Sequence, residues 1–203
     1  MHRRLSTRNE AGFTLIEVVV AITLLLVVAT AAIAFSIQAL KLGAQQQRTQ
    51  LAVTVAGERM EQVVRLTSSN AQLAPLVAGR DATAVAAAWS AASGVTGVAQ
   101  TYPASGSSGA QTVPLTQASS RGGTDFTSTV LIGTCYQPVS GGACTTVAGY
   151  TTDPAPASVS GKTRMIRAIV TVTYPGACGA TSGCRYTVMG LFDTRGDLVW
   201  ETK

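Results

Sequence analysis

The carboxylate of Glu17 lies in an unusual place, close to the start of a long apolar run. Residues 13–35 are apolar except for Glu17 and a few threonines. As a helix, this run is about 35 Å long, which is enough to cross a hydrocarbon core of about 30 Å. A lone acid at membrane depth costs free energy and is tolerated mainly when it has a partner. The sequence therefore predicts that Glu17 has a specific partner.

Four cysteines lie in the C-terminal part of the chain: Cys135, Cys144, Cys178 and Cys184. An even number of cysteines suggests two disulfides if this part faces an oxidising compartment. The short separations favour pairing Cys135 with Cys144 and Cys178 with Cys184, although four cysteines allow three pairings. A four-cysteine zinc site is disfavoured, because neither pair has the C-x-x-C spacing that such sites use.

The residues that could perform catalysis or hold a cofactor are sparse. Asp193 and Asp197, in "FDTRGDLV", are weak candidates for a calcium site, since hard cations bind clustered oxygen ligands. A turn between two strands explains these aspartates more simply. The only histidine, His2, precedes the apolar run, and the sequence shows no Ser/His/Asp set and no phosphate-binding glycine loop. We therefore expect no enzymatic activity, no cofactor and no metal.

The basic residues are few for a nucleic-acid-binding protein. Charged residues make up 12% of the chain, against about 25% in an average soluble domain, and the formal charge is +5. In "KTRMIR", Lys162, Arg164 and Arg167 could contact nucleic acid. Three dispersed basic groups are more typical of a solvated strand edge, where they oppose edge-to-edge pairing. A nucleic-acid partner is therefore not expected, although the sequence leaves it open.

Helical patterning continues beyond the apolar run. No proline occurs before Pro75, so the helix can extend through residues 36–66 without a strong stop signal. Apolar residues in this second part recur mostly at spacings of three to five among polar ones, which indicates an amphipathic helix with one face for packing. These residues are Leu51, Val55, Met60, Val63 and Val64.

Residues 67–124 read as a linker between the helix and a β-rich region. A short helix is expected near residues 79–93, with Asp81 close to its start and Trp89 as an apolar anchor. The rest of the linker, residues 91–124, is rich in Gly, Ser and Thr and reads as a long loop or a partly disordered connection.

Residues 125–203 change to a period of two. They contain strand-like segments separated by Gly, Pro and Ser: "DFTSTVLIGTCYQ", "TRMIRAIVTVTYP", "RYTVMGLFD" and "DLVWE". We therefore predict an antiparallel sheet of three to five strands that packs on the amphipathic half of the long helix.

The junction "AGFTLIE" resembles the processing site of type IV prepilins and of the related type II secretion pseudopilins. Residues 1–12, "MHRRLSTRNEAG", then form a short basic leader that is removed. The resemblance implies that a prepilin peptidase cuts after Gly12 and that the new N-terminal residue, Phe13, is methylated. Glu17 would pair with the free amino group at Phe13 of a neighbouring subunit, and Thr14 would assist by hydrogen bonding near the terminus.

The same resemblance implies a fold, a location and partners. The fold class is α+β and pilin-like, with a long N-terminal helix packed on a small antiparallel sheet. Basic residues before the span favour a single pass through the inner membrane with the head outside the cytoplasm, followed by a place in a pilus in the periplasm or at the cell surface. The implied partners are other pilin subunits, the prepilin peptidase and methylase, the inner-membrane assembly platform and, before assembly, the lipid bilayer.

Several functions remain open at this point. The apolar run resembles minor pilins of the pilus-modification group, with a role in pilus assembly, adhesion, motility or DNA uptake. The main alternative is a type II secretion pseudopilin, and a second is a membrane-anchored periplasmic binding or adhesin module. A secretory signal peptide cut near "ATAAIA" and a plain membrane anchor also compete for the N-terminal segment. Many major pilins carry a helix-breaking proline where this chain has Ala34.

Overall fold

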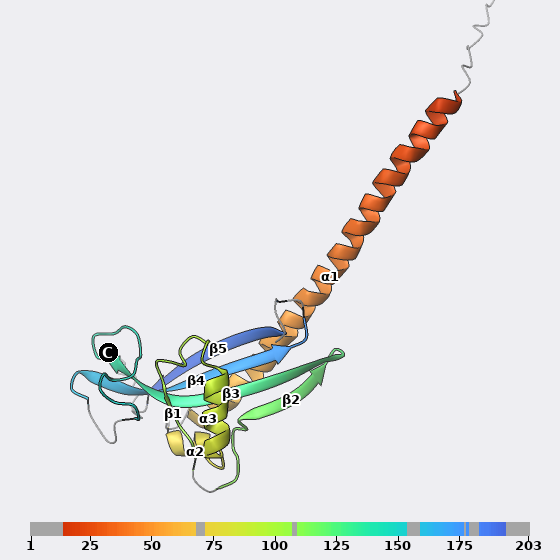
Figure 1. The fold of residues 1–203 in the computed structure, drawn as a ribbon. Coiled ribbons are helices and arrows are strands. Elements are labelled where there is room, and N and C mark those ends of the chain that lie inside the picture. The colour runs from red at the N-terminus through yellow and green to blue at the C-terminus, as the bar shows by residue number, and fades with distance from the viewer. Residues whose placement is uncertain are drawn as a thin grey trace, which may run out of the picture. The chain divides into compact units, whose positions relative to one another are not determined.

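Figure 1 shows the order of the helices and strands along the chain. In this computed structural model, the residues that can be described are 14–67, 72–106, 109–153, 159–176, 178 and 183–193. The contacts divide the chain into two units, residues 1–46 and residues 47–203. Helix α1 begins in the first unit and ends in the second.

Helix α1 runs from Leu15 to Thr67 without a break. It begins where the carbonyl of Thr14 accepts hydrogen bonds from the backbone N–H groups of Glu17 and Val18, at 3.0 and 3.3 Å. No proline interrupts it, and Ala34 lies inside the continuous helix. The predicted helix over residues 13–66 is therefore close to the observed one.

The second unit is built on an antiparallel sheet whose spine is the long strand β3, Thr124–Pro138. Strand β4, Lys162–Tyr174, pairs with β3 along one side and with β5, Cys184–Asp193, along the other. Two short strands share the remaining side of β3, namely β1, Tyr102–Pro103, and β2, Thr116–Arg121. Five strands thus form one sheet within the described residues, which confirms the predicted α+β fold.

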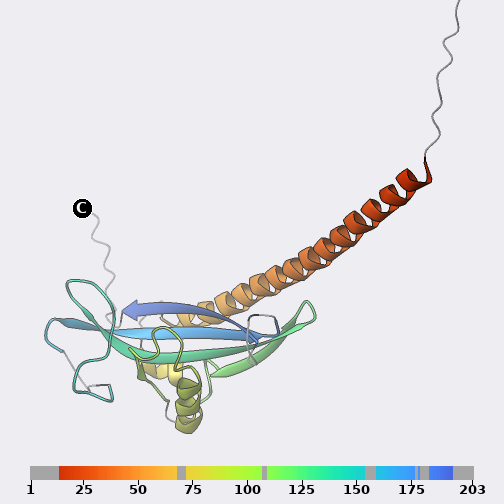
Figure 2. The ribbon, with the colours of Figure 1, turned by 45° about the horizontal axis from the view of Figure 1, so that its top comes forward.

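Opposite faces of the sheet pack on different helices. On β3, Val130 and Ile132 join the cluster that contains the C-terminal half of α1, whereas Leu131 joins the cluster that contains α3. Figure 2 shows α3, Ala82–Ala91, on one side of the sheet. The short helix α2, Leu73–Val77, adds its last two residues to the α1 cluster. The predicted apolar face of α1 therefore packs where expected, except at Val64, which is 42% exposed.

The short helix in the linker forms as the sequence predicts. Asp81 is the N-cap of α3, and its side chain accepts a hydrogen bond from the backbone N–H of Ala84 at 2.8 Å. Trp89 is buried in the cluster beneath the helix, together with Leu131 and Ile169. The cap fixes where α3 begins, and the tryptophan anchors it to the sheet.

The prediction that residues 91–124 form one long loop is wrong in part. This segment contains both β1 and β2, so the sheet begins well before residue 125. Strand β2 turns into β3 through Gly122 and Gly123, both with positive φ, of 55° and 70°. Such a two-residue turn matches the twist of a hairpin and favours glycine. The strand was missed because its residues are mostly polar and exposed, which hides the alternation that marks a strand.

Candidate functional site

The N-terminal half of α1 has an exposed apolar surface. Its most apolar 18-residue window has a mean hydropathy of 2.9 and no buried residue. Leu15, Phe35 and Leu40 are 83%, 73% and 75% exposed. By length and composition α1 is the one helix among the described residues that could cross a membrane. An apolar surface of this extent needs lipid or other protein to cover it.

The hydroxyl groups in this apolar run are satisfied within the helix. Thr23 donates to the carbonyl of Val20 at 2.8 Å, and Thr30 donates to that of Val27 at 2.9 Å. Ser36 donates to the carbonyl of Ala32 at 2.8 Å in the same way. Side chains that bond their own helix can enter lipid or a protein core without further partners. Glu17 is the only charged residue between residues 14 and 40.

Glu17 lies in the first turn of α1 with its side chain exposed. The aligned peptide dipoles leave a partial positive charge at this end of the helix, which favours a carboxylate there. Thr14 and Glu17 have the spacing of a capping box, a signal in the sequence that explains why the helix begins here. The predicted processing residues, Gly12 and Phe13, lie outside the described residues.

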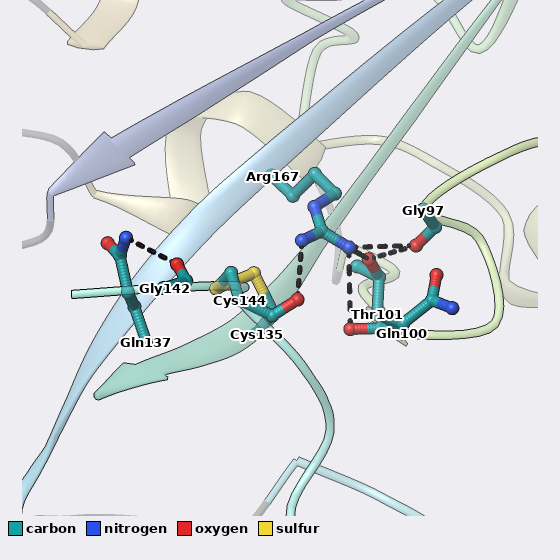
Figure 3. The surroundings of a disulfide bond; sticks show 8 residues. All are labelled: Gly97, Gln100, Thr101, Cys135, Gln137, Gly142, Cys144 and Arg167. Carbon is teal, nitrogen blue, oxygen red and sulfur yellow. Dashed lines mark hydrogen bonds between the residues drawn. A yellow bond between two sulfur atoms is a disulfide. The ribbon is translucent and has the colours of Figure 1, made fainter.

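Arg167 is not on a solvated strand edge, as the sequence suggested, because β4 is a central strand. The residue is 7% exposed, and its guanidinium donates to two loop segments. Nη1 donates to the carbonyl of Gly97 at 2.9 Å and to Oγ1 of Thr101 at 2.8 Å, and Nη2 donates to the carbonyl of Cys144 at 2.6 Å (Figure 3). Burial lowers the pKa of Arg167. The arginine therefore ties the turn after α3 and the disulfide loop to the sheet.

The two other basic residues of "KTRMIR" lie on the same strand. Arg164 forms an ion pair with Asp153, a residue of the loop between β3 and β4. Lys162 begins β4 and is paired with Pro138 of β3. With Arg167 buried, the three residues do not form one exposed basic patch, so the structure gives no support to a nucleic-acid site here.

Two further buried arginines hold the connection between α3 and β3. Arg80 is 2% exposed and donates from Nε to the carbonyl of Val113 at 3.0 Å and from Nη1 to that of Val130 at 2.9 Å. Burial, followed by the nearby charge of Arg59, lowers the pKa of Arg80 to about 10. Arg59, on α1, donates to the carbonyl of Pro114 at 2.7 Å. These arginines fix in place a segment that sequence composition alone describes as a loop.

The structure contains two disulfides, Cys135–Cys144 and Cys178–Cys184, with Cα–Cα distances of 5.4 and 5.0 Å. These are the pairs that the short sequence separations favour. The first closes the loop whose carbonyl at Cys144 accepts from the buried arginine of β4 (Figure 3). Among the described residues no group of three acidic, histidine or cysteine side chains could hold a metal ion. Asp193 ends β5, and Asp197 lies outside the described residues, so the weak calcium proposal stays untested.

The N-terminal segment matches a known family motif. Residues 7–33 match the prokaryotic N-terminal methylation motif. The motif covers the Gly12–Phe13 junction, Glu17 and the first part of α1, and it supports a type IV pilin or pseudopilin subunit. The motif implies processing by prepilin peptidase and assembly with other pilin subunits. Together, the motif and the apolar helix that follows it are consistent with membrane anchoring before assembly. No curated protein and no solved structure matches the chain significantly.

Proposed function

We propose that this protein is a minor pilin of a type IV pilus, cut after Gly12, methylated at Phe13 and assembled through the N-terminal half of α1. The observation that carries the proposal is the single carboxylate of Glu17, which lies within the methylation motif in an otherwise uncharged apolar segment. A structural subunit needs such a segment for assembly, whereas a plain anchor gives no reason for the acid.

Glu17 acts as a register device in this proposal. After the leader is removed, Phe13 carries a free amino group, and Glu17 of one subunit pairs with Phe13 of its neighbour. A buried charge without a partner costs several kcal/mol, so only the stagger that joins the two charges is stable. The exposed position of Glu17 in the first turn of α1 leaves its carboxylate accessible to another subunit. Thr14 holds the start of the helix next to this pair.

A type II secretion pseudopilin is the second candidate, because it needs the same leader, helix and head. The two functions differ in where the mature chain is found. A minor pilin is recovered in pili sheared from the cell surface in smaller amount than the main subunit. A pseudopilin stays with the cell, and its loss stops the release of secreted proteins. Recovery of the native protein only with the cells would therefore contradict the pilus proposal.

The test of the register device is the variant Glu17→Gln, which keeps the size of the side chain and removes its charge. Leader removal should be normal, because cleavage precedes pairing. Loss of a buried ion pair costs well over 1.4 kcal/mol, so the amount of variant in sheared pili should fall by at least about tenfold. The control is Thr30→Val, since the Thr30 hydroxyl bonds only its own helix. Normal incorporation of the glutamine variant would show that the charge is not used for register.

A further inference from the structure

A cavity of about 610 Å³ lies over β4 and β5, and its volume is typical of sites for small molecules. Its floor includes Arg167 of β4 together with Met189 and Leu191 of β5, and the strand register places Leu191 directly opposite Arg167. Its walls come from the turn after α3 and from the loop that the first disulfide closes. These are the two loops that Arg167 holds, so the shape of the cavity depends on the same arginine.

The charge of Arg167 has no negative partner in the part of the chain that the structure describes. Its guanidinium donates to four neutral oxygens, which belong to Gly97, Gln100, Thr101 and Cys144. None of the ion pairs between described residues includes Arg167, and its Nε has no acceptor among these residues (Figure 3). A buried charge is costly unless it is paired and hydrogen-bonded. An anion in the cavity would supply both the missing acceptor and the missing charge.

Gly97 lies where the arginine meets an apolar side chain. A Cβ added at Gly97 would lie 3.5 Å from Nη1 of Arg167 and 2.7 Å from the sulfur of Met189. The φ angle of 88° at this position also favours glycine. The guanidinium and the thioether therefore lie close to the same point, so a ligand beside them contacts a cation and an apolar surface together.

Polar side chains lie around the cavity with unused hydrogen-bonding groups. The hydroxyls of Thr96 and Thr145 and the side-chain amide of Gln100 line the cavity, and none of them bonds another residue in the described ranges. Met189 and Leu191 add apolar surface that is 45% and 44% exposed. A purely aliphatic acid would leave the hydroxyls and the amide unused. A sugar acid has a carboxylate for the arginine, hydroxyls for the polar groups and C–H surface for the apolar ones.

We propose that this cavity binds an acidic sugar, with its carboxylate on Arg167. Nε and Nη2 lie on one edge of the guanidinium, and this edge can bind a carboxylate through two parallel hydrogen bonds. Nη2 gives one of its two hydrogens to the carbonyl of Cys144, which leaves the other for the ligand. The site adds a ligand to the head and does not depend on which filament the protein joins.

The test is saturation-transfer NMR on the full-length protein in micelles of a deuterated non-ionic detergent, at constant ionic strength. The probe is sodium glucuronate, and micelles without protein give the blank. Glucose lacks the carboxylate, and acetate lacks the hydroxyls and the ring. We expect glucuronate to bind at least about tenfold more tightly than either, because only glucuronate uses both the arginine and the polar groups.

Leu191 allows the charge to be tested without removing the arginine. Leu191→Glu places a carboxylate on the strand position opposite Arg167, where cross-strand side chains contact each other, and this carboxylate should compete with the ligand. Glucuronate should therefore bind at least about tenfold more weakly. The matched control is Leu191→Gln, which has the same size without the charge and should keep the affinity within about threefold. Leu191 is 44% exposed, so both variants should fold, and Trp89 emission in a Trp200→Phe background verifies this.

Three results would overturn the proposal. The first is glucuronate that gives no more saturation transfer than the protein-free blank. The second is acetate or glucose that binds as tightly as glucuronate, which would mean that the cavity does not select an acidic sugar. The third is glucuronate binding that Leu191→Glu and Leu191→Gln change equally, which would place the carboxylate away from Arg167.

Discussion

Replacing Arg167 with methionine should destabilise the head without breaking its sheet. Methionine keeps most of the aliphatic side chain and removes the hydrogen bonds to the carbonyls of Gly97 and Cys144 and to Oγ1 of Thr101. Hydrogen bonds to a charged group are worth about 1.5–3 kcal/mol each. Two effects make the net loss smaller than the sum of these hydrogen-bond energies. Water can reach the freed acceptors through the adjacent cavity, and burial of the arginine already costs hydration free energy, as its lowered pKa indicates. We expect the free energy of unfolding to fall by about 2–4 kcal/mol.

The assay is urea unfolding of the full-length protein in micelles, followed by the fluorescence of Trp89 in a Trp200→Phe background that removes the second tryptophan. Arg167→Lys should give an intermediate loss, because lysine keeps the charge but not the planar fork that reaches acceptors in both loops. The matched control is Arg185→Met, since Arg185 is an exposed arginine on the neighbouring strand β5, and its replacement should change the stability by less than about 0.5 kcal/mol. A methionine variant at position 167 as stable as this control would refute the idea that the buried arginine holds the loops.

Two further predictions follow from particular residues. Gly133→Ala should lower the free energy of unfolding by about 1–3 kcal/mol, because the added Cβ would overlap the backbone carbonyl of Tyr102. Gly57→Ala, on α1 where the added Cβ would lie in open space, should instead raise the free energy of unfolding by about 0.5–1 kcal/mol. Urea unfolding measures both changes, and equal effects would contradict the close approach of β1 and β3. Burial and the hydrogen bond to Asp153 raise the pKa of Tyr136 to about 12, so stability is unaffected by this group below pH 10 and falls by about 1.4 kcal/mol per pH unit from there to pH 12. Tyr136→Phe should remove this loss, and a tyrosinate absorbance titration that finds no group ionising near pH 12 would contradict it.

The parts of the fold that depend on local pattern could be predicted from the sequence. The long helix follows from its composition and the absence of proline before Pro75, and Asp81 marks the start of α3 by a capping rule that acts within four residues. The short disulfide pairings follow because chain ends a few residues apart meet easily. Each of these signals is contained within one short segment.

The parts that depend on distant segments meeting could not be predicted. Arg167 looks like any strand arginine in the sequence, and its role arises because the turn after α3 and the loop at Cys144 both reach it in the folded head. The same holds for Arg80, whose acceptors lie 33 and 50 residues away. Strand β2 was missed for another reason, because a polar edge strand lacks an apolar face to reveal its period.

The mature N-terminus tests the central claim most directly. Intact-mass and peptide mass spectrometry of the protein purified from its native cells would identify the first residue and any methyl group on it. The pilin account predicts a chain that begins at Phe13 with an N-methyl group. A chain that still begins at Met1, or one that begins after the "ATAAIA" segment, would contradict it.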